Sequence, residues 1–196
     1  MFAFFAGLAA GLLHVFSGPD HLAAVAPLAA DSDRGKWRTG LQWGIGHTTG
    51  VLLIAGLLLL VRERLPLDAI SAHSERLVGI ALILVGAWGF WSARVRRRAG
   101  ATTHSHSGAS FGMGALHGLA GSSHLFGVLP ALAFATRIEA AFYLAGFGAG
   151  AIAGMTAFSA AMGLLSSRLS RRHSSGLLYA SSAAALVVGG FWLVGQ

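Results

Sequence analysis

Ionisable side chains inside apolar stretches are the part of this sequence best suited to chemistry. Five of the nine histidines and one of the seven acidic residues lie within such stretches. They are His14, Asp20, His21, His47, His117 and His124. Ionisable groups in hydrocarbon are costly unless paired or bound, so each is a candidate functional residue, although a lone histidine can also serve as a structural hydrogen-bonding group between helices. Imidazoles with one carboxylate, in a chain without cysteine, suit a divalent ion such as nickel, cobalt or zinc and suit copper(I) poorly, so we expect these six residues to form a metal site.

The spacing of His14 and His21 requires a break in their helix if both are to bind one ion. On an unbroken helix they would lie about 10.5 Å apart along the axis, whereas ligands lie about 2 Å from a bound ion. Ser17-Gly18-Pro19 stands between them and favours such a break, with Pro19 opening a new half-helix. Gly121-Ser122-Ser123 predicts a similar break later in the chain. Broken backbone within a membrane lines a cavity or is buried in protein, so paired breaks indicate a binding site.

Composition places the chain among membrane proteins. Hydrophobic residues make up 55% and charged residues 11% of the 196, and the mean hydropathy is +0.67. A soluble chain of this size needs more charge on its surface. The pI near 11.5 does not indicate nucleic-acid binding, because the basic residues form small clusters between long apolar runs. We expect an all-α polytopic membrane protein with six transmembrane helices at 2–30, 39–61, 77–93, 111–135, 140–165 and 176–195.

The six stretches form two similar units of three. Residues 11–30 and 114–133 agree at nine of twenty positions without a gap, including two histidines and a proline. A weaker similarity pairs 44–50 with 146–152. An odd number of spans inverts the second unit relative to the first, as in secondary transporters with a substrate site near the midplane, and the first and fourth helices are expected to be broken. The units are 1–98 and 111–196, joined by a basic, histidine-containing cytoplasmic linker at 99–110.

Basic and aromatic residues predict the orientation in the membrane. Ten of the fourteen Lys and Arg residues fall in the connections after the first, third and fifth stretches. The positive-inside rule places these connections in the cytoplasm and both termini outside the cell membrane. Trp43, Trp88, Trp91 and Trp192 fall near expected span ends, which is typical of an interfacial belt.

Two motifs carry a resemblance to a known family. The first is HVFSGPDHLAAVAPLA, with His14, Asp20 and His21, and the second, one span later, is GIGHTTG, with His47. In both, the chain resembles the nickel/cobalt transporter (NiCoT/NicO) superfamily, above all its short, six-span, UreH-like members. The resemblance covers most of the chain, and it implies recognition of nickel or cobalt by these four residues.

We therefore expect a secondary transporter or permease for divalent transition-metal ions, with nickel or cobalt bound near the midplane and released by alternating access. Ni²⁺ or Co²⁺ is then the transported substrate, and no cofactor is expected. The chain is not expected to be an enzyme, because it has no H-E-x-x-H motif and Asp20 has no second intramembrane carboxylate beside it. The expected partners are the metal ion and the lipid bilayer, without nucleic acid; self-association into a homo-oligomer is left open.

Two other functions stay open at this point. The same scaffold could carry an anionic small substrate, because half-helix N-termini at Pro19 and Ser122 attract anions. Histidine pairs could instead ligate haem. The chain has no phosphate-binding loop, so ATP would have to act through a partner. Exchange of a proton for metal at His14 or His21 predicts tighter binding as pH rises through about 6 to 7.

Overall fold

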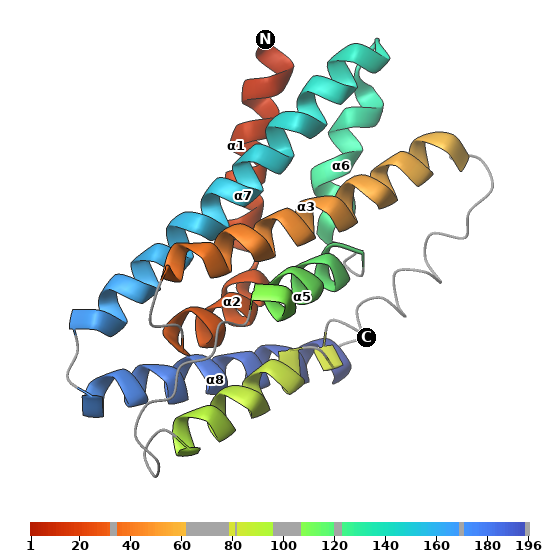
Figure 1. Ribbon diagram of the computed structural model, residues 1–196. Helices are drawn as coiled ribbons and strands as arrows, with labels where there is room; N and C mark the ends of the chain where they lie inside the picture. The colour runs from red at the N-terminus through yellow and green to blue at the C-terminus, as the bar shows by residue number, and fades with distance from the viewer. Residues whose placement is uncertain are drawn as a thin grey trace.

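The computed structural model describes residues 1–31, 35–61, 79–80, 82–95, 107–119, 123–168 and 171–194, which form helices and no strand (Figure 1). The helices are α1 (Phe2–Ser17), α2 (Pro19–Asp31), α3 (Lys36–Val61), a helix over Leu82–Val95, α5 (Ser107–Leu119), α6 (Ser123–Ala133), α7 (Arg137–Arg168) and α8 (Arg171–Val194). Within this part of the chain the expected all-helical class is confirmed. The expected linker at 99–110 lies largely outside the described residues, and α5 begins within it at Ser107.

The first expected span is broken where the sequence predicts a break. Helix α1 ends at Ser17, α2 begins at Pro19, and the two are bent by 73°. Pro19 takes the first position of α2, where a backbone N–H would have no helical partner in any case. The Gly18 N–H donates to the His14 carbonyl at 3.1 Å and closes the last turn of α1. In the fourth expected span the structure describes α5 as far as Leu119 and α6 from Ser123, and the break expected at 121–123 falls largely on residues outside the described part.

Two glycine-rich seams hold the two units together. In one seam α1 packs against α7, and in the other α5 packs against α3 (Figure 1). A Cβ at any of the seam glycines would meet a backbone carbonyl oxygen of the facing helix, so only glycine permits this close approach. The α1–α7 seam contains Gly7, Gly11, Gly146 and Gly150, and the α3–α5 seam contains Gly46, Gly50, Gly114 and Gly118. The broken span of each unit therefore packs against the second helix of the other unit.

The seams also show how α3 corresponds to α7. Gly11 and Gly114, which the alignment of 11–30 with 114–133 pairs, face the carbonyls of Phe147 and Trp43, respectively. This register differs from the sequence alignment of 44–50 with 146–152 by two residues. Short glycine-rich segments align equally well in several registers, whereas packing permits one. In the packed register, the counterpart of Trp43 is Phe147, and that of His47 is the apolar Ala151.

Helix α8 and the helix over Leu82–Val95 pack behind α2 and hold it in place (Figure 1). The α2 segment from Ala23 to Ala30 is buried throughout. It contacts both α8 and α7. This cover fixes the position of the first turn of α2, which carries Asp20 and His21.

Within the described residues, the capacity to cross a membrane rests on α7 and on the α1–α2 pair. Helix α7 has 32 residues and a mean hydropathy of 1.5 in its most apolar window, so it is long and apolar enough to cross a membrane on its own. Helices α1 and α2 are long and apolar enough to cross a membrane if the two are counted together as one bent span. The segments Leu82–Val95 and Gly176–Phe191 are apolar but shorter. The arrangement with six spans therefore stays a prediction.

Candidate metal centre

The break between α1 and α2 brings His14 and His21 together. Their ring centroids lie 4.5 Å apart with an interplanar angle of 82°. Gly18 makes this approach available, because a Cβ at that position would collide with Nδ1 of His21. His14 is half-buried and His21 is completely buried. The bend thus removes the separation that an unbroken helix would impose on the two imidazoles.

His47 of α3 completes a first group of ligands with these two residues. Its ring centroid lies 5.0 Å from that of His21 and 5.7 Å from that of His14. One ligand atom from each of the three imidazoles lies within 4.8 Å of the other two. Ligands about 2 Å from an ion lie up to about 4 Å apart, so small inward shifts would close this group around one ion. We call His14, His21 and His47 the histidine triad.

Asp20 forms a second group with His21 and His117. Its Oδ1 lies 3.0 Å from Nδ1 of His21, and its Oδ2 lies 3.1 Å from Nε2 of His117. The three side chains are at most 5% exposed, and their ligand atoms also lie within 4.8 Å of one another. We call this group the Asp20 triad. Because His117 comes from α5 in the second unit, the Asp20 carboxylate connects the two units.

The structure thus brings together five of the six candidate ligands predicted from the sequence. The sixth, His124, lies on α6, and its side chain is outside the described residues. Its role at the site therefore stays a prediction.

Trp43 belongs to the surroundings of the site, which sequence reasoning missed. We expected an interfacial side chain, but Trp43 is 0% exposed and its indole stacks on His47, with ring centroids 5.1 Å apart at 13°. Its ring also lies 5.2 Å from His117 and 5.7 Å from His21. The indole Nε1 is buried and has no hydrogen-bond partner among the described residues. The available signal was the spacing of four residues from His47, which places both side chains on one face of α3.

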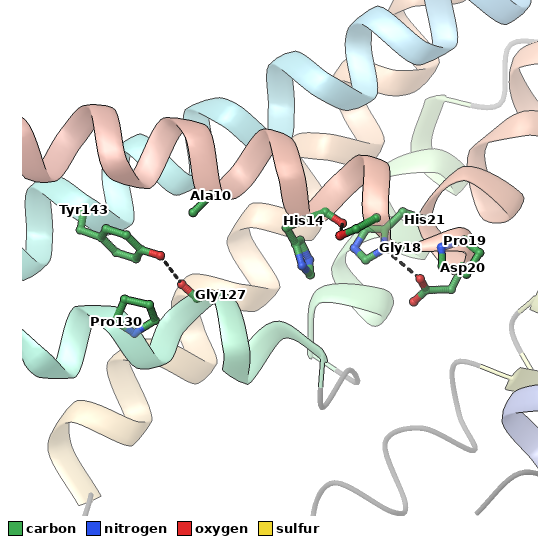
Figure 2. A pocket seen from close by; sticks show the side chains of 10 residues that line it. Ala10, His14, Gly18, Pro19, Asp20, His21, Gly127, Pro130 and Tyr143 are labelled. Atoms are coloured by element: carbon green, nitrogen blue, oxygen red, sulfur yellow. Dashed lines mark hydrogen bonds and ion pairs between the residues drawn. The ribbon is translucent and has the colours of Figure 1, made fainter.

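A cavity of about 440 Å³ reaches His14, Asp20 and His21 (Figure 2). At its other end, the Tyr143 hydroxyl donates to the Gly127 carbonyl at 2.9 Å and connects α7 to α6. A water molecule occupies about 30 Å³ in the liquid, so an ion with about six waters fits within this volume. The cavity therefore provides a route by which a hydrated ion could approach the histidines.

The donor set favours a particular class of ion. Four imidazoles and one carboxylate offer nitrogen and oxygen ligands, which suit nickel, cobalt and zinc. The single buried carboxylate would offset one of the two charges of such an ion. In metal sites, a ligating imidazole usually donates its second N–H to a carboxylate or carbonyl, and the contacts of Asp20 with His21 and His117 have this form.

Comparison with known proteins identifies the family. The chain is 30% identical over 196 residues to the urease accessory protein UreH of Bacillus sp. (strain TB-90), in an alignment that covers 86% of this chain and 81% of UreH. The chain belongs to the UreH family. This finding confirms the resemblance to a nickel/cobalt transporter-like family, and it supports a membrane protein.

Two proteins of Arabidopsis thaliana are similar to this UreH-family chain as well. Chloroplast protein FOR GROWTH AND FERTILITY 2 is 35% identical over 207 residues, covering 97% of the chain, and FOR GROWTH AND FERTILITY 1 is 31% identical over 206 residues, covering 93%. The chain spans about half the length of these two relatives, 55% and 56%. No family model matches the chain, and no solved structure matches it.

Proposed function

We propose that this UreH-family chain is a secondary transporter, or permease, for divalent transition-metal ions, with nickel or cobalt as the substrate. The observation that carries the proposal is the convergence of four imidazoles and one carboxylate from α1, α2, α3 and α5 on one buried place beside a cavity. Membership of the UreH family supports the same choice of metal.

The position of the site at a helix break supports transport. Irregular backbone within a membrane persists where it lines a cavity or is buried in protein, and half-helices at such breaks form the substrate sites of many secondary transporters. Gly18 lies at this break and lines the cavity together with His14 and His21. In the proposed cycle, tilting of one unit against the other opens the site to one side of the membrane at a time.

The carboxylate of Asp20 argues against an anionic substrate. The N-terminus of α2 would attract an anion, but Asp20 lies in its first turn and is only 4% exposed. A bound anion would meet this like charge in a buried setting, whereas a divalent cation gains from it.

We further propose that the protein lies in the cell membrane with both termini outside. The clustering of Lys and Arg in alternate connections supports this orientation. A reporter fused to either terminus, assayed for activity on the outer and the cytoplasmic side, tests the orientation; cytoplasmic termini would refute it.

The first test of the function is metal binding by the full chain in detergent. Ni²⁺, Co²⁺ and Zn²⁺ are titrated into the wild-type protein and into His21→Ala, which removes the residue that both triads use. His173→Gln, outside the two ligand motifs, controls for the loss of an imidazole. We expect saturable binding of about one ion per chain in the wild type and in His173→Gln, and its loss in His21→Ala. Absence of saturable binding, or equal binding by His21→Ala and the wild type, would refute the metal site.

Transport itself is tested with the protein in liposomes that contain a metal-sensitive dye. The wild type should carry Ni²⁺ or Co²⁺ to the dye faster than liposomes with His21→Ala. Binding without any uptake above that of the variant would show a metal-binding protein that does not transport.

A further inference from the structure

We propose that the ion occupies two alternative positions that share His21, and that transport passes it from one position to the other. This inference rests on the proposed function. The first position is the histidine triad, and the second is the Asp20 triad. A shared ligand lets an ion change position while one bond to the protein is kept, so the ion need not return to water between them.

The two positions differ in the units that they connect. The histidine triad comes entirely from α1, α2 and α3 of the first unit, whereas the Asp20 triad takes His117 from α5 of the second unit. An ion at the first position therefore makes no bond to the second unit. An ion at the second position ties α2 to α5, so the position of the ion is coupled to the arrangement of the units.

The cavity indicates the order in which the positions are used. His14 lies along the cavity between its Tyr143 end and His21, and Asp20 lies beyond His21 (Figure 2). His14 is the half-buried member of the histidine triad, whereas every member of the Asp20 triad is buried. An ion that arrives from the Tyr143 end of the cavity thus meets the histidine triad first.

Charge favours the second position once the ion has entered. Three neutral imidazoles leave both charges of the ion uncompensated, whereas the carboxylate of Asp20 offsets one of them in a buried setting. To enter, the ion replaces the contacts of 3.0 Å and 3.1 Å that Asp20 makes with His21 and His117. At equilibrium we therefore expect the ion at the Asp20 triad.

Two variants separate the positions, because each removes a ligand from one triad only. His47→Gln affects the histidine triad and His117→Gln affects the Asp20 triad. The visible absorption of bound Co²⁺ reports its ligands, and uptake of Co²⁺ into dye-loaded liposomes reports transport. We expect His47→Gln to keep the wild-type Co²⁺ spectrum but to take up Co²⁺ more slowly. We expect His117→Gln to bind Co²⁺ within about tenfold of the wild-type affinity, with an altered spectrum, and to stay transport-deficient at saturating Co²⁺.

A single shared site predicts a different result. The same spectral change in both variants, or uptake by His117→Gln that saturating Co²⁺ restores, would overturn the two positions. Asp20→Asn weakens the same triad from α2, so it replaces His117→Gln if that variant fails to fold, with an altered Co²⁺ spectrum and deficient transport at saturating Co²⁺ as the expected results. Failure of the metal-transport function is distinguishable, because it would appear as no saturable Co²⁺ binding by the wild type.

Discussion

The close packing of α3 against α5 predicts that Gly118→Ala damages the metal site, although it adds one methyl group. A Cβ at Gly118 would meet the carbonyl oxygen of His47, and it would lie 2.9 Å from the carbonyl carbon and 3.1 Å from the Cα of that residue. Ordinary contacts between carbon atoms begin at about 3.5 Å, so the helices must separate by at least about 0.6 Å. His117 precedes Gly118 on α5, and a shift of that size carries its 3.1 Å contact with Asp20 beyond hydrogen-bonding distance.

The matched control for this variant is Gly112→Ala on the same helix, where a Cβ meets nothing within 4 Å. Overpacking costs about 1–3 kcal/mol, or about 2–12 °C in the midpoint of thermal unfolding for a chain of this size. We expect the midpoint of thermal unfolding in detergent to fall by this amount for Gly118→Ala. For Gly112→Ala we expect an equal or higher midpoint, because alanine stabilises a helix by about 1 kcal/mol relative to glycine. Nickel titration of the same samples should show about tenfold weaker binding for Gly118→Ala alone. Equal midpoints and equal affinities for the two variants would refute the close-packed seam.

Two further predictions concern the ligands and their surroundings. Asp20→Asn should weaken Ni²⁺ and Co²⁺ binding about 10- to 100-fold in the same titration, because it removes the one carboxylate; tighter binding of anions without loss of metal would favour the anionic substrate instead. Trp43→Leu should weaken metal binding more than Trp43→Phe, since phenylalanine keeps an aromatic ring beside His21 and His117; equal affinities for both variants and the wild type would show that the ring has no such role.

The break and its two histidines could be predicted from the sequence because the determinants are local. Gly18 and Pro19 cannot continue a regular helix as other residues do, and they stand between two residues that are costly in an apolar segment. The same reasoning selected His47 from a single span. In each case the residue is recognised from the segment in which it lies, and the structure adds the distances between the side chains.

Contacts between the two units could not be predicted in this way. His117 was a candidate ligand, but nothing in the local pattern showed that it would lie beside Asp20, since that contact depends on how α5 packs against α3. The same packing determines the surroundings of Trp43. Its place near the end of an expected span indicated the interface, whereas the structure buries its ring completely beside His21, His47 and His117. Many small residues recur in both units, so the sequence allowed several registers and only the packed helices select one.

The two units therefore share a backbone arrangement but divide the chemistry unequally. Where α3 presents Trp43 and His47 to the site, α7 has Phe147 and Ala151 at the corresponding positions, with Phe147 in contact with His14. Because the histidine triad lies within the first unit, a movement of one unit against the other changes the coordination of the ion through His117. In the proposed transport, the first unit therefore supplies most of the ligands, and His117 makes the coordination of the ion depend on the position of the second unit.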